Sequence, residues 1–237
     1  MSERKITTKE SDYQINSGTA YTSAAFGHDC QILSGGDDQN RIYVWKVTNT
    51  KPKLELTGQK TCSTILRFSN NQTNSQLFSG TFGGTLHVWE LQGQREIVKF
   101  LGHKAGVSAV CSSDNDDIVA TGSHDTRIKL WDLRQKQNTL SFKKHTQKIE
   151  TLEMSPDNLF VASGAADGSL RIWDLRANKE FSCYMTPGQH SVTCCQFNPQ
   201  YQTIANGSTD KTIKLWDLVT NQYVTMTSPD VAPIQHI

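Results

Sequence analysis

The chain has 237 residues, with 24 Lys and Arg against 23 Asp and Glu, so its formal charge at neutral pH is +1. This balance gives no reason to expect nucleic acid or an anionic membrane surface as a partner. The longest apolar runs are far shorter than a membrane span, and the polar residues 1–5 lead into no apolar core of a secretory signal. We therefore expect a cytoplasmic protein without nucleic-acid or membrane partners.

The six cysteines show no paired C-x-x-C spacing. Neither a zinc site nor a disulfide framework is therefore indicated, and reduced thiols are expected. We predict no cofactor and no metal.

The five tryptophans divide the chain evenly. They follow one another at intervals of 44, 42, 42 and 43 residues, from Trp45 to Trp216. A period of about 40–45 residues is typical of the four-stranded blade of a β-propeller. We therefore predict an all-β propeller of five blades and the start of a sixth. The predicted division is an N-terminal segment that closes the ring as an outer strand (1–16), blades at 17–57, 58–101, 102–143, 144–187 and 188–228, and the start of blade 6 at 229–237.

The first two blades depart most from the pattern. In blade 1 we expect Asp38 as the acid of the turn after the second strand, with Ser34 and Trp45 as its structural partners. Blade 2 carries Gln59 where the other blades have histidine and Gly83 where the turn acid belongs. We expect blade 2 to be locally weaker.

Blades 3 to 5 repeat one set of polar residues at fixed distances. A histidine precedes the tryptophan by 28, 28 and 26 residues, and an aspartate precedes it by six residues in all three. The residues are His103, Thr121, Asp125 and Trp131 in blade 3; His145, Ser163, Asp167 and Trp173 in blade 4; His190, Asn206, Asp210 and Trp216 in blade 5.

Three segments, 128–132 (IKLWD), 170–174 (LRIWD) and 213–217 (IKLWD), resemble WD-repeat units. Within that superfamily, the chain is similar to the regulatory, non-ATPase subunit of katanin in residues 33–38, 101–105, 119–123, 125–126, 128–134 and 210–218. The family's carboxy-terminal helical region is absent from this sequence. Since five blades and a fragment leave sheet edges open, we also expect the sequence to be part of a longer chain.

The katanin resemblance implies a non-catalytic propeller that positions a microtubule-severing ATPase or an axonemal or centrosomal assembly. The implied partners are a katanin-type AAA ATPase subunit and microtubule-associated or axonemal proteins. The implied location is the cytoskeleton, at the centrosome, basal body or cilium axoneme. An unrelated WD-repeat scaffold would share every one of the fold-level features.

The repeated His, Ser or Thr, and Asp residues are also the ingredients of a hydrolase triad. A triad needs one nucleophile, one base and an oxyanion hole, whereas three blades carrying the same set indicate a repeated structural role. The WD-repeat resemblance implies a buried chain of hydrogen bonds from Asp through His and Ser or Thr to Trp. We therefore predict no catalytic residues and rank an enzyme last.

Candidate partner-binding residues lie where the repeat places loops on one face of the ring. The residues expected there are Phe82, His124, Thr209, Lys148 and Glu150. Phe82 is the sharpest candidate because aromatic residues are enriched at binding hot spots, although a turn side chain folded against blade 3 would explain it as well. His124, Lys148 and Glu150 have the alternative of being ordinary solvated residues.

The ending Trp-Asp-Leu-Arg occurs in two consecutive blades and supplies Arg134 and Arg176. Consecutive endings of this kind resemble substrate receptors of cullin-RING ubiquitin ligases, in which the arginines face the adaptor. A substrate receptor is therefore the alternative function. In the structural alternative, each arginine binds neighbouring carbonyl groups and caps its own blade.

Overall fold

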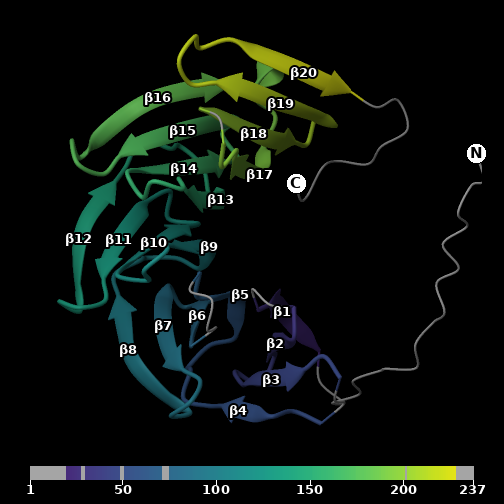
Figure 1. Ribbon diagram of the computed structural model, residues 1–237, viewed down its shortest axis with the longest axis vertical. Helices are drawn as coiled ribbons and strands as arrows, with labels where there is room; N and C mark the ends of the chain where they lie inside the picture. Colours follow the sequence, from purple (N-terminus) through teal and green to yellow (C-terminus); the bar gives the residue numbers. More distant parts are fainter. Residues whose placement is uncertain (1–19, 28–29, 49–50, 71–74, 201, 228–237) are drawn as a thin grey trace, which may run out of the picture.

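The computed structural model describes residues 20–27, 30–48, 51–70, 75–200 and 202–227. Within these residues, 20 strands form five four-stranded antiparallel sheets, each in simple sequential order (Figure 1). The predicted ring-closing segment 1–16 and the predicted start of blade 6 at 229–237 lie outside the described residues.

Each sheet is one blade, numbered in chain order. Blade 1 contains β1 (Tyr21–Phe26), β2 (Ile32–Asp37), β3 (Ile42–Lys46) and β4 (Leu54–Leu56). Blade 2 contains β5 (Ser63–Phe68), β6 (Gln76–Thr81), β7 (Thr85–Glu90) and β8 (Arg95–Leu101). Blade 3 contains β9 (Val107–Ser112), β10 (Ile118–Ser123), β11 (Ile128–Asp132) and β12 (Gln137–Phe142).

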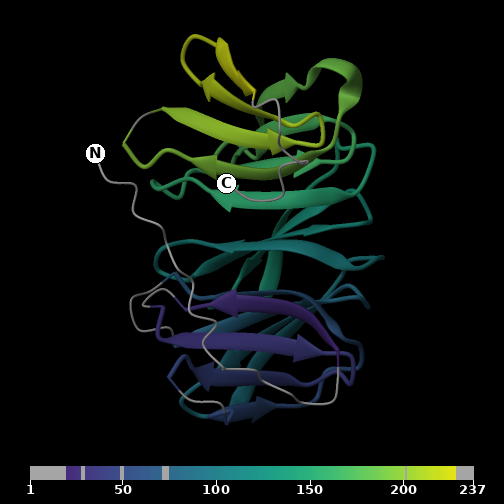
Figure 2. The same ribbon diagram turned by 90° about the vertical axis from the view of Figure 1, so that its right-hand side faces the viewer.

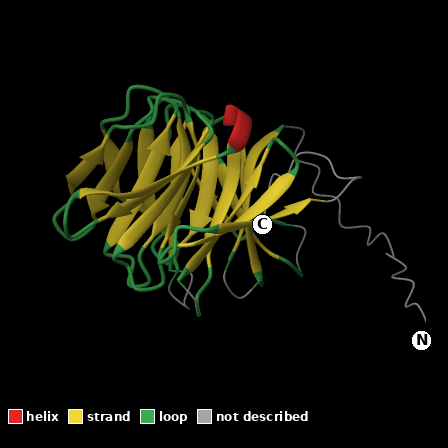
Figure 3. Ribbon diagram, turned by 90° about the horizontal axis from the view of Figure 1, so that it is seen from above, coloured by secondary structure: helices red, strands yellow, loops and turns green. Residues whose placement is uncertain are grey.

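The last two blades repeat this order. Blade 4 contains β13 (Ile149–Met154), β14 (Phe160–Ala165), β15 (Ser169–Asp174) and β16 (Lys179–Met185). A 3-10 helix, η1 (Pro187–Gln189), leads into blade 5, which contains β17 (Val192–Phe197), β18 (Thr203–Ser208), β19 (Thr212–Asp217) and β20 (Tyr223–Thr227). Figure 3 shows this helix at one rim of the strands.

The first strand of each sheet lies toward the centre and the fourth lies at the periphery (Figure 1). The sheets follow one another in chain order, as the side view in Figure 2 shows. This arrangement confirms the predicted fold class, an all-β propeller whose five blades form an incomplete ring.

The apolar cores lie between blades because residues alternate between the two faces of a strand. Trp131 of blade 3 packs in one cluster with Leu86 and Val88, which belong to the third strand of blade 2. Trp173 of blade 4 joins Ile128 of blade 3 in the same manner. The tryptophan period is therefore the period of the contacts between neighbouring blades.

Hydroxyl groups on the innermost strands add a second link between blades. Thr22 Oγ1 donates to the carbonyl oxygen of Ser63 at 2.6 Å, and Ser108 Oγ donates to that of Ile149 at 2.5 Å. Thr64 makes the corresponding bond to Val107. Neighbouring inner strands are thus connected by side chains as well as by packing.

The two ends of the blades form two distinct faces. We call one the connector face; it carries the connections between successive blades and the turns between second and third strands. The other is the hairpin face, which carries the turns between first and second and between third and fourth strands. Because the strands are antiparallel, the two sets of turns lie at opposite ends of every sheet.

Candidate functional site

The polar residues predicted for blade 3 meet in one buried chain of hydrogen bonds. His103 Nδ1 lies 3.0 Å from Asp125 Oδ2, and His103 Nε2 lies 2.8 Å from Thr121 Oγ1. The indole Nε1 of Trp131 donates to the same Thr121 oxygen at 2.8 Å. The chain runs from the turn on the connector face to the third strand and ties them together.

Asp125 is the charged end of this chain. Burial raises the pKa of its carboxyl group, but the hydrogen bonds from His103 and from the backbone N–H of Lys104 outweigh burial and lower the pKa to about 2. Asp125 is therefore ionised at neutral pH and holds the connection that enters blade 3 against the turn between β10 and β11.

Blade 4 repeats the arrangement with Ser163 as the hydroxyl group. His145 Nε2 and Trp173 Nε1 both lie 2.7 Å from Ser163 Oγ, and His145 Nδ1 lies 3.1 Å from Asp167 Oδ2. Burial opposes ionisation of Asp167, but the bonds from His145 and from Ser169 outweigh it and hold the pKa well below its ordinary value.

These hydroxyl groups are poorly placed for nucleophilic catalysis. Thr121 and Ser163 are fully buried, and each hydroxyl oxygen already contacts both an imidazole and an indole nitrogen. A nucleophile must reach its substrate beside an oxyanion hole, and this geometry offers no such access. The arrangement stabilises the blade.

The prediction of His190 for blade 5 is wrong. His190 is exposed and lies just after η1, because in this blade the histidine precedes the tryptophan by 26 residues instead of 28. The ammonium group of Lys214 takes the place of the imidazole: its Nζ lies 2.9 Å from Asp210 Oδ2, and the side chain is buried. Asn206 Oδ1 accepts from Trp216 Nε1 at 2.7 Å, but Asn206 Nδ2 is buried without a hydrogen-bond partner, so the chain of blade 5 is interrupted between Asn206 and Lys214.

Blade 2 retains a polar chain that the sequence analysis missed. Gln59 is buried and its side-chain amide donates to Ser79 Oγ, which also accepts from Trp89 Nε1 at 3.2 Å. Ser63 Oγ donates to Gln59 Oε1 at 3.0 Å. Glutamine supplies both a donor and an acceptor, as a neutral imidazole does, and its place after Gly58, where blade 3 has Gly102 before His103, is the signal in the sequence.

The predicted set of Asp38, Ser34 and Trp45 does not form in blade 1. Leu33 pairs with Trp45, just as Val119 pairs with Trp131, so the two blades align without an insertion. Ten residues before Trp45, where blade 3 has Thr121, blade 1 has Gly35. With no side chain there, Trp45 Nε1 is buried without a hydrogen-bond partner.

The other two predicted residues of blade 1 lie elsewhere. Ser34 points to the opposite side of its strand from position 35, and its hydroxyl donates to the carbonyl oxygen of Ala25 at 3.4 Å. Asp38 is exposed; the buried acid is Asp37, whose Oδ2 accepts from Arg41 Nε at 2.8 Å.

Phe82 lies on the connector face at the turn between β6 and β7, and its side chain is 64% exposed. It is therefore not folded away against blade 3. Leu101, at the end of β8, is 71% exposed on the same face, and its strand partner is Thr85, three residues after Phe82. The sequence analysis did not single out Leu101. We call Phe82 and Leu101 the blade 2 apolar patch.

The remaining candidates on this face are polar. His124 and Thr209 are exposed and their backbone N–H groups bond to the connections before β9 and β17. Lys148 Nζ pairs with Glu150 Oε1 at 2.8 Å. Glu150 replaces the hydroxyl residue that links inner strands in blades 1 to 3, so that link is missing between blades 4 and 5.

A family model described as the nucleolar protein 10-like, N-terminal domain, a β-propeller, matches residues 58–236. The chain belongs to this family. The match includes blades 2 to 5 and therefore every buried hydrogen-bonded residue described for these blades. No curated protein matches the chain.

Membership in the nucleolar protein 10-like family agrees with the predicted WD-repeat type of propeller and gives no support to the katanin resemblance. The two arginines of the cullin alternative lie on the hairpin face, in the turns after β11 and β15. Both are exposed; Arg134 Nε pairs with Asp117 Oδ1 of its own blade at 2.6 Å.

Two further observations concern the part of the chain that the structure describes. No three His, Cys, Asp or Glu side chains gather there in a group that could hold a metal ion. No helix there has the length and apolar character needed to cross a membrane.

Proposed function

We propose that this nucleolar protein 10-like propeller is a non-catalytic protein-docking scaffold, and that it binds a protein partner through the blade 2 apolar patch. The observation that carries the proposal is the exposure of Phe82 and Leu101 on the connector face. Both residues belong to the same end of blade 2, and exposed aromatic side chains are enriched at binding hot spots.

The base of this patch is rigid, which favours docking because little conformational freedom is lost on binding. Gly84, two residues after Phe82, has a positive φ of 78°. A side chain at this position would lie 2.8 Å from the carbonyl oxygens of His103 and Ala105. The turn that presents Phe82 therefore rests directly on the connection that enters blade 3, and this connection is held by Asp125.

The test compares partners of the chain with and without the patch. A proximity-labelling fusion of the chain is expressed in cells of its source, and labelled proteins are quantified by mass spectrometry. Phe82→Ala with Leu101→Ala should remove a defined subset of partners by at least about tenfold. The matched control is Val219→Ala, an exposed apolar residue on the hairpin face. An identical partner set for wild type and the double variant would refute the proposed site.

For the location, we propose association with the nucleolus, because the family description names a nucleolar protein. A fluorescent fusion of the chain should overlap a nucleolar marker, and the family match favours this over the cytoskeletal location implied by the katanin resemblance. Overlap with centrosomes or axonemes, together with co-purification of an AAA ATPase, would favour the katanin interpretation instead.

The ubiquitin-ligase alternative depends on Arg134 and Arg176. The ion pair of Arg134 with Asp117 engages one of the two guanidinium groups within its own blade, which favours the structural role. Loss of binding to a cullin adaptor on replacing both arginines by alanine would revive the alternative.

A further inference from the structure

A cavity of about 380 Å³ lies between blades 4 and 5 on the hairpin face. The blade 2 apolar patch lies on the opposite face and in another blade. Its volume falls within the range of about 300–1,000 Å³ that is usual for ligand sites. We infer that this cavity is a second docking site, which takes an extended peptide segment of a partner protein with a bulky apolar side chain next to a lysine or arginine. It goes beyond the proposed function and does not depend on Phe82.

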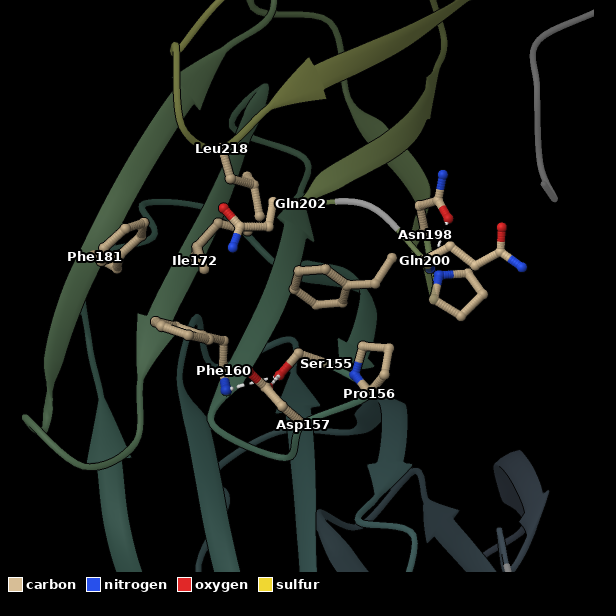
Figure 4. Close-up of a pocket in the computed structure, with 12 residues that line it drawn as sticks. Ser155, Pro156, Asp157, Phe160, Ile172, Phe181, Asn198, Gln200, Gln202 and Leu218 are labelled. Carbon is tan, nitrogen blue, oxygen red and sulfur yellow. Dashed lines mark hydrogen bonds between the residues drawn. The ribbon is translucent and has the colours of Figure 1, made fainter.

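One wall of the cavity is aromatic and aliphatic. Phe160 and Phe181 of blade 4 are in edge-to-face contact with ring centroids 5.2 Å apart, and Phe181 is 50% exposed. Ile172 of blade 4 and Leu218 of blade 5 continue this wall. Figure 4 shows these apolar side chains on one side of the cavity and Asn198 and Gln200 across from them. An apolar side chain placed here would cover the exposed part of Phe181.

The opposite wall indicates a peptide in preference to a purely apolar molecule. Asn198 and Gln200 lie across from the aromatic wall, whereas Gln202, which comes from the same turn between β17 and β18, lies beside Ile172 and Leu218 (Figure 4). Side-chain amides offer both donors and acceptors, which are the groups that the backbone of an extended peptide requires. The combination of an apolar wall and an amide wall therefore matches one side chain and its flanking main chain.

The charge of the lining specifies the neighbouring residue of the peptide. Asp157 is the one charged residue among the described residues that line the cavity, and it is exposed. Its Oδ1 accepts from Ser155 Oγ at 2.5 Å and from the backbone N–H of Leu159 at 3.0 Å, so the carboxylate is held in position. A fixed negative charge beside an apolar cavity favours a basic residue next to the apolar anchor.

The sequence of these two blades explains why the cavity is open. The pairing of Phe160 with Asp174 corresponds to that of Thr203 with Asp217, so Gln202 of blade 5 occupies the position that Leu159 has in blade 4. Leu159 is half-buried, whereas Gln202 is exposed. The exposed aromatic wall is also particular to blade 4, since the bulge residue Phe181 corresponds to Thr139 in blade 3.

The test selects peptides from a random dodecapeptide library displayed on phage, with the purified chain as target and its Phe181→Asp variant as counter-target. The expected consensus is one bulky apolar residue flanked by Lys or Arg. A fluorescein-labelled consensus peptide should bind the chain in an anisotropy titration, and Phe181→Asp should weaken binding by at least about tenfold. Asp157→Asn, which keeps an oxygen acceptor for Ser155 and Leu159, should weaken it several-fold, and added salt should do the same.

Thr139→Asp is the matched control, because it places the same charge at the corresponding bulge of the neighbouring blade. It should leave peptide binding unchanged, and thermal unfolding of both variants should match that of the wild type within a few degrees. Three results would overturn the inference: no consensus beyond the library background, a consensus peptide insensitive to Phe181→Asp, or an acidic consensus. Self-association of the chain that Phe181→Asp abolishes would assign the cavity to a second copy and would also overturn it.

Discussion

Replacing serine by alanine at two fully buried positions, Ser163 and Ser34, tests whether the hydrogen-bonded chain stabilises its blade. Ser163 belongs to such a chain in blade 4, whereas Ser34 was predicted to belong to one in blade 1 and does not. The chemical change is identical and neither side chain is exposed to solvent. Ser163→Ala leaves His145 Nε2 and Trp173 Nε1, each 2.7 Å from the hydroxyl oxygen, without that partner inside the protein. Ser34→Ala removes one weak hydrogen bond of 3.4 Å to the carbonyl oxygen of Ala25.

The difference in cost follows from these contacts. Each buried polar group left without a partner costs about 1–3 kcal/mol, so Ser163→Ala, which leaves two, should lower the free energy of unfolding by about 2–6 kcal/mol. Ser34→Ala should lower it by less than about 1 kcal/mol. At about 2–4 °C per kcal/mol for a chain of this size, the first change corresponds to a fall in Tm of about 4–24 °C and the second to a fall of at most about 4 °C.

Urea unfolding followed by tryptophan fluorescence and by far-UV circular dichroism measures both values. Coincident transitions from the two probes are required before the free energies are compared. Equal losses for the two variants would refute the reasoning, since they would mean that burial of the hydroxyl group, and not its contacts with histidine and tryptophan, determines the cost.

Three further predictions concern charged and reactive groups. Lys214→Met should lower the free energy of unfolding by about 2–4 kcal/mol in urea titrations, because it leaves the Asp210 carboxylate without its buried cation, whereas exposed His190→Ala should change it by less than about 0.5 kcal/mol. Because the pKa of Asp125 is held at about 2, below its ordinary 3.8, the stability that this carboxylate contributes is complete above about pH 4 and is lost as the pH falls toward 2. In urea titrations from about pH 6 to 2, the free energy of unfolding of Asp125→Asn should therefore depend less on pH than that of the wild type. Exposed Cys30 should react with a thiol reagent in the native protein, whereas Cys111, fully buried and with a pKa raised by burial to about 12, should react only after denaturation.

Each of these has an outcome that contradicts it. A larger loss for His190→Ala than for Lys214→Met would restore the histidine to the chain of blade 5. An unchanged pH dependence in Asp125→Asn would mean that other carboxylates dominate acid unfolding. Reaction of Cys111 at the rate of Cys30, read by peptide mapping of the labelled protein, would mean that blade 3 opens readily.

The sequence predicted the fold and the polar chains of blades 3 and 4, and it failed where the distance to tryptophan or the residue type departs from those two blades. Spacing to tryptophan located Asp125 and Asp167 correctly because those blades have turns of equal length. In blade 5 the same residue type, His190, is displaced by two residues, and spacing alone did not reveal that Lys214 could reach the vacated place. In blade 1 the position six residues before Trp45 is Gln39, so the residue type of Asp38 favours it as the turn acid but its distance to the tryptophan does not.

The cavity between blades 4 and 5 illustrates what spacing could not reveal. Its open state depends on Gln202 and Phe181, which belong to different blades and are far apart in any repeat alignment. A cavity formed by side chains of two repeats can be recognised only when both repeats are placed in three dimensions. Gln59 shows the opposite case, because the sequence shows that glutamine replaces histidine but not that its side chain bonds to both Ser79 and Ser63.

Because Trp89, Trp131, Trp173 and Trp216 pack on the previous sheet, the apolar interiors lie between repeats and the cooperative unit of stability spans two of them. A cut between two sheets would divide an apolar interior and expose apolar surface to water on both fragments, although each sheet would keep its backbone hydrogen bonds. Sheets deleted or exchanged as whole repeats would therefore be tolerated only where the new neighbours present matching surfaces. The five sheets share four such interiors, and melting of one should propagate to the next.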